Sequence, residues 1–279
     1  MKQSHFYVAS KGVCAITWPP KRSLFKKILC LLACFTFLPT PAWSDTLGKS
    51  SFGTAFMVSD NGHLLTAWHV IKDKEQVFIG PFGDKKWVKA DVLLIDADND
   101  LALLSTPTIR SRALTIAEWS SVPLGLEVYV IGYPRPGMMG LTKKLTQGII
   151  NGDRLKPGSK GLFQFSAEIQ QGNSGGPVLA PDGTVVGLAQ RKLDALKIAE
   201  RSKDLPQNVN YGTKSIALLE FMREAGIRPK TTATDLSLNP RPYLIYKQTE
   251  QSVFAVLAGQ KRTAVTPFTT EGDGSLFPQ

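Results

Sequence analysis

The sequence predicts an all-β fold, and two observations support this. Short apolar runs alternate with turn signals such as Ser59-Asp60-Asn61-Gly62 and Pro181-Asp182-Gly183. Short strands at this even spacing are typical of antiparallel sandwiches and barrels. The composition, with 43% hydrophobic and 20% charged residues in 279, is that of an ordinary globular protein. No apolar run in the body of the chain reaches the roughly 18 residues of a spanning helix.

The expected strands fall into two halves of similar style. The first run alternates and stops at a hairpin signal, and the runs after it are equally short. In the first half, strands are expected at 52–58, 64–65, 77–79, 88–95 and 101–104. After a connector at 105–125, strands are expected at 127–131, 146–150, 162–165, 178–179 and 185–189.

One helix is expected, at 215–225, because apolar residues recur there at helical spacing. Ser215 suits its N-cap and Gly226 its C-cap, and the apolar stripe consists of Ile216, Leu219 and either Phe221 or Met222. After Gly226 the signals weaken. The runs 243–246 and 253–257 predict a last hairpin, and 269–279 a frayed tail.

The first 44 residues have the features of a secretory signal peptide. Lys26-Lys27 precede an apolar run at 28–38, and small residues occupy Ala42 and Ser44. We therefore expect cleavage after Ser44 and a periplasmic or secreted product. A short membrane anchor and a lipoprotein box at Leu31-Leu32-Ala33-Cys34 are the alternatives. The chain would meet a membrane only if this leader were retained.

The charge and cysteine patterns exclude several function classes once the leader is set aside. The chain carries a net charge of +10, but the leader holds six lysines and arginines and no acid. The remaining 27 bases and 23 acids do not form the concentrated positive face that nucleic-acid binding needs. All three cysteines, Cys14, Cys30 and Cys34, lie in the leader. We therefore expect no disulfide, no thiol nucleophile, no metal site and no cofactor.

Three residues form a candidate catalytic set. His69 follows the strand expected at 64–65, Asp100 precedes the one at 101–104, and Ser174 stands in Gly172-Asn173-Ser174-Gly175-Gly176-Pro177. A serine hydroxyl becomes a nucleophile when a base takes its proton, and an imidazole does this near neutral pH. A buried carboxylate fixes the imidazole tautomer. The amides of Gly172 and Ser174 would face a developing oxyanion.

Each piece alone has an ordinary structural explanation. A histidine at a strand end, an aspartate before an apolar strand and a glycine-rich turn are all common. The three in this order, on two halves of short strands, favour the catalytic interpretation.

These residues resemble the trypsin-like serine peptidases, and above all the cysteine-poor bacterial branch that includes the high-temperature-requirement (Deg-type) proteases. The resemblance covers about Ser51 to Ala225. It rests on the segments 51–56, 66–70, 100–104, 130–134, 146–150 and 172–177. It implies two antiparallel six-stranded β-barrels, a chymotrypsin-like double barrel, with a C-terminal helix. It also implies His69 as general base, Asp100 as its orienting acid, Ser174 as nucleophile, and Gly172 and Ser174 as the oxyanion hole.

The chain departs from this family's pattern in two places. Digestive members have an aspartate before the nucleophile, where it pairs with a new N-terminus, but Asn173 carries no charge. Deg-type proteases usually continue into peptide-binding PDZ domains, whereas the 54 residues after Ala225 are too few for one.

The specificity pocket remains open between two interpretations. Glu168, six residues before Ser174, would lie at the pocket floor by the digestive enzymes' count and favour a basic substrate residue. Otherwise it is a solvated or ion-paired loop glutamate, which we prefer. Gln190 is expected near the pocket walls, and Lys143-Lys144 on a solvated face.

The sequence therefore predicts a signal peptide at 1–44, a trypsin-like domain at 45–228 and a C-terminal extension at 229–279. We expect the protein to be an exported serine endopeptidase that cleaves polypeptides through an acyl-enzyme intermediate. The alternative is an inactive or latent protease-like binding protein. The oligomeric state stays open, and so does the role of 226–279: a barrel edge, an autoinhibitory tail or a partner site.

Overall fold

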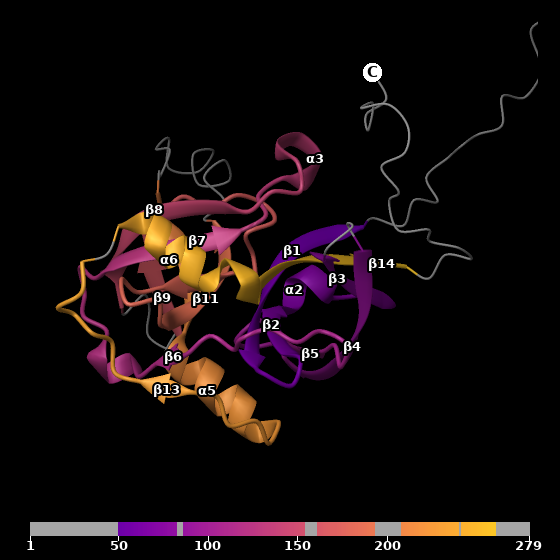
Figure 1. Ribbon diagram of the computed structural model, residues 1–279, viewed down its shortest axis with the longest axis horizontal. Helices are drawn as coiled ribbons and strands as arrows, with labels where there is room; N and C mark the ends of the chain where they lie inside the picture. Colours follow the sequence, from indigo (N-terminus) through magenta and orange to yellow (C-terminus); the bar gives the residue numbers. More distant parts are fainter. Residues whose placement is uncertain (1–49, 83–85, 154–160, 193–207, 240, 261–279) are drawn as a thin grey trace, which may run out of the picture. The chain divides into compact units, whose positions relative to one another are not determined.

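The computed structural model describes residues 50–82, 86–153, 161–192, 208–239 and 241–260 (Figure 1). The expected leader at 1–44 and the expected tail at 269–279 lie outside these residues. Among the helices of the described ranges, none is long and apolar enough to cross a membrane.

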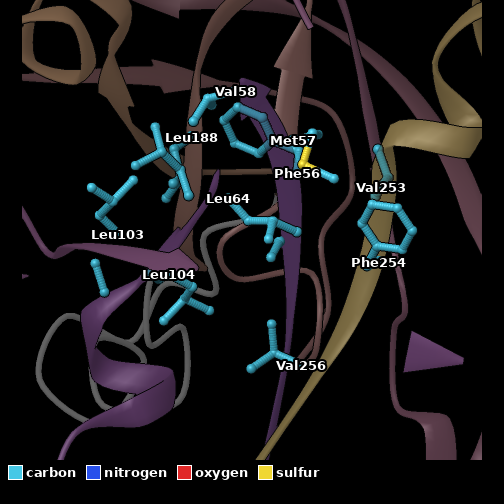
Figure 2. Packing of buried hydrophobic residues seen from close by; sticks show 14 of the residues in the cluster. Phe56, Met57, Val58, Leu64, Leu103, Leu104, Leu188, Val253, Phe254 and Val256 are labelled. Atoms are coloured by element: carbon cyan, nitrogen blue, oxygen red, sulfur yellow. The ribbon is translucent and has the colours of Figure 1, made fainter. Parts of the chain in front are cut away.

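The first barrel is closed by six antiparallel strands. Its strand order is β1-β14-β3-β4-β5-β2. The strands are β1 (Ser51–Ser59), β2 (His63–Ala67), β3 (Gln76–Phe82), β4 (Lys86–Asp96), β5 (Leu101–Ser105) and β14 (Val253–Gly259). Buried apolar side chains fill it, among them Phe56, Leu64 and Val256, which are all 0% exposed (Figure 2).

The second barrel is also made of six antiparallel strands. They run in the order β10-β7-β8-β9-β12-β11, and pairing of β10 with β11 closes the ring. The strands are β7 (Glu127–Gly132), β8 (Lys144–Gly152), β9 (Leu162–Phe165), β10 (Pro177–Leu179), β11 (Val185–Lys192) and β12 (Asn210–Lys214). Phe163 lies at its centre, with its ring centroid 5.6 Å from that of Phe165 and 5.3 Å from that of Trp119.

Two short strands extend the second sheet in parallel. β6 (Ile116–Ala117) pairs with β11, and β13 (Thr231–Thr232) pairs with β6. Together with the helix α5 (Ser215–Glu224), the two rings confirm the predicted double barrel with a C-terminal helix.

The caps of α5 each lie one residue before the predicted residue. At the C-terminal end the C-cap is Ala225, and the predicted Gly226 follows it directly. Gly226 has φ +73°, its amide donates to Arg223 O, and the amide of Ile227 donates to Met222 O. This is the Schellman arrangement that glycine favours. At the other end the N-cap is Lys214, not Ser215, because the chain turns from β12 directly into the helix. The buried Oγ of Ser215 has no hydrogen-bond partner among the described residues.

The predicted C-terminal hairpin is wrong. Residues 243–246 belong to the helix α6 (Pro242–Thr249), which Pro242 opens at its first turn, where the lost N–H costs nothing. A short 3-10 helix, η2 (Glu250–Ser252), leads from it to β14. β14 inserts between β1 and β3. The boundary expected at residue 228 thus cuts between strands of one barrel.

The structure also contains elements too short for periodicity to reveal. These are α2 (Trp68–Ile71), η1 (Trp119–Ser121) and α3 (Pro136–Met139). Of these, α2 matters most, because it places the histidine of the candidate site.

Candidate active site

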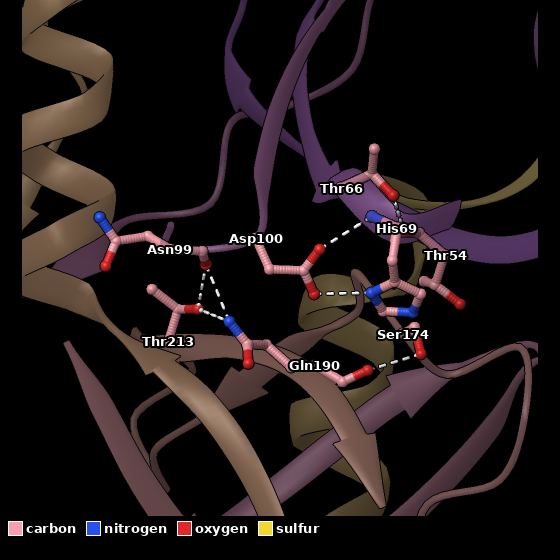
Figure 3. A network of polar contacts seen from close by, with 8 residues as sticks. All are labelled: Thr54, Thr66, His69, Asn99, Asp100, Ser174, Gln190 and Thr213. Carbon is pink, nitrogen blue, oxygen red and sulfur yellow. Dashed lines mark hydrogen bonds and ion pairs between the residues drawn. The ribbon is translucent and has the colours of Figure 1, made fainter. Parts of the chain in front are cut away.

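His69 and Asp100 meet on the first barrel through two hydrogen bonds. His69 lies in α2, directly after β2, and Asp100 directly precedes β5. The Nδ1 of His69 lies 2.6 Å from the Oδ2 of Asp100, and its backbone amide donates to Oδ1 at 2.8 Å (Figure 3). The carboxylate therefore holds both the ring and the backbone of His69. Side-chain exposure is 41% for the histidine and 11% for the aspartate, so one face of the imidazole is open to solvent.

Asp100 adopts a left-handed backbone, and the second barrel helps to hold it. Its φ is +55°, a conformation that aspartate tolerates better than most residues. Its carbonyl accepts from the amide of Trp68 at 3.1 Å. The carbonyl of Asn99, one residue earlier, accepts from Gln190 Nε2 at 2.8 Å and from Thr213 Oγ1 at 2.9 Å. Strands β11 and β12 thus fix the peptide that carries the carboxylate.

The turn that carries Ser174 packs closely on the first barrel. The amide of Thr54, in β1, donates to the carbonyl of Ser174 at 2.8 Å. Gly175 has φ +86°, and a Cβ added there would lie 2.2 Å from Thr54 O and 2.7 Å from the amide of Ala67. Only glycine fits such a contact. The serine turn is therefore seated against the end of β2, two residues from His69.

The hydroxyl of Ser174 donates to the main-chain carbonyl of Gln190 at 2.6 Å (Figure 3). A serine hydroxyl has one proton to donate. In this structure that proton is directed to Gln190 O and not to the imidazole. Rotation about the Cα–Cβ bond of Ser174 would redirect it.

The backbone around Gly172 is held by its carbonyls. Thr54 Oγ1 donates to Gly172 O at 2.7 Å, and the amide of Arg135 donates to Gln171 O at 2.7 Å. Gly172 itself has φ +103°. No described residue accepts a hydrogen bond from the amides of Gly172 or Ser174. Two backbone donors thus remain available beside the serine.

The two residues predicted for the specificity pocket differ in position. Glu168 is exposed, and its carbonyl accepts from Thr146 Oγ1 at 2.8 Å. Gln190 is only 5% exposed, and its side-chain amide binds Asn99 O and Thr213 Oγ1. Gln190 therefore reaches the site through its main chain, and its side chain is committed to the support of Asp100 rather than open to a substrate.

Three supporting residues escaped prediction from the sequence: Thr54, Asn99 and Thr213. They act through backbone carbonyls or single hydroxyls, which carry no motif. Among the residues that the structure describes, no group of three or more histidine, cysteine, aspartate or glutamate side chains gathers as a metal site.

Comparison with known proteins agrees with this fold. A family model for the trypsin-like peptidase domain matches residues 53–188. The uncharacterized protein y4bJ of Sinorhizobium fredii is 34% identical over 190 residues, which cover 68% of this chain and 30% of that protein. A probable periplasmic serine endoprotease, DegP-like, from Halomonas elongata is 29% identical over 54% of this chain and 31% of its own length.

A solved structure adds the same fold. The serine endoprotease from Yersinia pestis matches with a TM-score of 0.50 and 26% identity, over 62% of this chain and 57% of that one. The chain spans about a third of the length of the two curated relatives.

Two closed barrels that carry a histidine–aspartate pair and a Gly-Asn-Ser-Gly-Gly-Pro turn define a class, the trypsin-like serine peptidase domain. Within that class, the chain resembles the peptidase domain of the Deg-type proteases.

Proposed function

We propose that this protein is an exported serine endopeptidase with Ser174 as nucleophile, His69 as general base and Asp100 as the acid that orients it. The observation that carries the proposal is the double hydrogen bond of Asp100 to the ring and amide of His69. A carboxylate on Nδ1 fixes the tautomer whose Nε2 accepts a proton, and it stabilises the imidazolium that forms.

The reaction proceeds in two halves. The Ser174 hydroxyl rotates from Gln190 O toward His69, gives its proton to Nε2, and its oxygen attacks the scissile carbonyl carbon. The amides of Gly172 and Ser174 donate to the oxyanion, and the imidazolium returns its proton to the leaving amine. Water then attacks the acyl-enzyme with His69 again as base. Loss of a single oxyanion donor costs about 10²–10³ in kcat in comparable enzymes.

Export is a separate part of the proposal. The leader features at 1–44 support it, as does the similarity to a probable periplasmic endoprotease of Halomonas elongata. N-terminal sequencing of protein recovered from the periplasm or medium tests it, with Asp45 expected as the first residue.

The activity is tested with a fluorophosphonate probe, which reacts only with an activated serine. Wild type starting at Asp45 is compared with Ser174→Ala, Asp100→Asn and the exposed-serine control Ser237→Ala. We expect labelling of wild type and the control, none of Ser174→Ala, and a rate for Asp100→Asn lower by roughly 10⁴-fold, because the wrong tautomer dominates. Equal labelling of wild type and Ser174→Ala would exclude Ser174 as nucleophile.

A latent, protease-like binding protein is the second candidate. The bond from Ser174 Oγ to Gln190 O favours it, because the hydroxyl is not engaged with a base. A folded wild type that labels only after a peptide is added would identify this form.

A further inference from the structure

The C-terminal strap, which we define as Pro242–Gly259, touches both barrels. It comprises α6, η2 and β14, shown in yellow in Figure 1. Ile245 of α6 is fully buried in one apolar cluster with Tyr129 and Ile131 of β7. Val256 of β14 belongs to the same cluster, and β14 also contacts β7. The strap therefore packs in the same apolar core as β7, the first strand of the second barrel.

The strap holds one end of the loop that follows β7. This loop, residues 133–143, ends at Lys143, whose Nζ donates to the main-chain carbonyl of Glu250 in η2. Burial lowers the pKa of Lys143, and the nearby Glu250 carboxylate partly offsets that effect. The prediction of a solvated face is therefore wrong for Lys143, which is anchored on the strap.

The other end of the loop is buried beside the same strap residues. Tyr133 is 4% exposed. Burial raises the pKa of its hydroxyl, and Tyr246 of α6 and Glu250 of η2 raise it further by their charge. The side chain of Tyr133 therefore lies near both strap residues.

The backbone of the same loop end supports Gly172. A Cβ added at Gly172 would lie 2.2 Å from Tyr133 O, so the two backbones are in direct contact. The amide of Tyr133 donates to Thr54 Oγ1 at 3.1 Å, and that hydroxyl donates to Gly172 O. Two residues on, Arg135 donates its amide to Gln171 O from a left-handed backbone with φ +39°.

We propose that the C-terminal strap is a positioning element for the oxyanion hole, and that Lys143 is the positioning residue that couples the two. This inference rests on the proposed function. In a trans peptide the carbonyl and amide point in opposite directions. The bond from Arg135 to Gln171 O therefore sets where the Gly172 amide points, and any shift of the loop turns that donor.

The middle of the loop is the short helix α3, in which the amides of Met138 and Met139 donate to Arg135 O, and its apolar side chains are open to solvent. Met138, Met139 and Leu141 are 75%, 47% and 39% exposed. We infer that the position of Arg135 and α3 relative to the barrels depends on the two anchored ends. Removing the Lys143 anchor frees one end and leaves His69, Asp100 and Ser174 untouched.

The test compares Lys143→Met with Lys144→Met, a change at the next residue, which is the first of β8. Lys144 forms no side-chain hydrogen bond or ion pair with any residue that the structure describes. In Lys143→Met we expect the rate of fluorophosphonate labelling and kcat to fall at least tenfold. The upper limit is the loss of roughly 10²–10³ that follows complete removal of one oxyanion donor. Lys144→Met should stay within twofold of wild type, and Lys143→Arg, which keeps a donor, should recover most of the rate.

Two further readouts separate positioning from a general loss of structure. The pH at which the rate is half-maximal should not move in Lys143→Met, because the His69–Asp100 pair is unchanged. Thermal unfolding should show a folded protein at the assay temperature. A shifted pH profile, or equal losses in both methionine variants, would overturn the proposal.

A measurement independent of activity completes the test. Amide hydrogen exchange of a peptide that covers 170–176 should speed up in Lys143→Met and not in Lys144→Met. If wild type shows no labelling, the proposed function fails, and this exchange experiment still decides the strap's role. Unchanged exchange in Lys143→Met would overturn it.

Discussion

The two barrels have the same number of strands but close in different ways. The second barrel takes all six strands from residues 127–214, and its ring is closed by β10 and β11, which are joined by the short turn at 180–184. The first barrel takes β1 to β5 from residues 51–105 and its sixth strand from 253–259. The second barrel closes through strands that are near one another in the sequence. The first barrel needs a strand from the far end of the chain. Closing the second barrel therefore costs less conformational entropy, because its strands span a shorter stretch of sequence.

The largest expected effect comes from removing the distant strand. A chain truncated after Ser252 loses β14 and leaves facing edges of β1 and β3 unpaired. Val253, Phe254 and Val256 are buried, and such side chains contribute about 1.5–3 kcal/mol each. Their sum is comparable with the roughly 5–15 kcal/mol stability of a domain, so we expect no folded first barrel.

Circular dichroism and urea unfolding measure this, with a chain truncated after Gln260 as control, since that chain retains every described strand. An unfolding midpoint for the shorter chain that matches the control would show that β14 is dispensable.

The next effect targets the locally closed barrel. Phe163 is 0% exposed and central to the second barrel. Phe163→Ala should lower the free energy of unfolding by about 3–5 kcal/mol through lost burial and a cavity. If the second barrel can fold by itself, the loss should appear as a lower urea midpoint of one cooperative transition that belongs to this barrel. A change below about 1 kcal/mol would indicate that the second barrel tolerates the cavity by collapse.

A smaller effect is expected from filling the same space. A Cβ at Gly187 would lie 2.4 Å from Phe163 Cε1 and 2.4 Å from Thr213 O. Gly187→Ala should therefore cost about 1–3 kcal/mol by overpacking. Combining it with Phe163→Leu should recover part of that loss, as read from urea midpoints. Additive losses in the double variant would mean that the clash with Thr213 O dominates.

The smallest effect reports on the first barrel alone. His63, on β2, lies 2.7 Å through Nδ1 from Ser59 Oγ, and burial lowers its pKa below 6.5. Folding therefore disfavours its protonation, so the stability is complete above pH 6.5 and declines as pH falls through the folded-state pKa. His63→Gln should flatten this part of the stability curve between neutral and mildly acidic pH. NMR titration of the His63 ring should give a midpoint below 6.5, and a midpoint above it would contradict the prediction.

The sequence predicted the elements that repeat or carry motifs. The alternation at 52–58 and the helical spacing at 215–225 place β1 and α5 almost to the residue. The residue types around His69 and Asp100 indicate a pair that the structure brings to 2.6 Å.

Other features depend on partners distant in the chain. The continuous apolar run Val253–Ala258 suits a strand buried on both faces, but nothing local says that it lies between β1 and β3. The short apolar run at 243–246 predicts a strand, but the same run also suits a helix that packs on a core. Periodicity alone cannot distinguish the two. The roles of Gln190 and Lys143 depend on carbonyls of Asn99 and Glu250, which no side-chain pattern encodes.

The late position of β14 also orders events during synthesis. A ribosome makes the chain from the N-terminus, so all residues of the candidate active site emerge before the strand that closes the barrel carrying His69 and Asp100. Until residue 259 has left the ribosome, β1 and β3 lack the strand that pairs with both of them. A double barrel built in this way cannot close its first ring until β14 has been made, so the pair of His69 and Asp100 gains its complete barrel only at the end of synthesis.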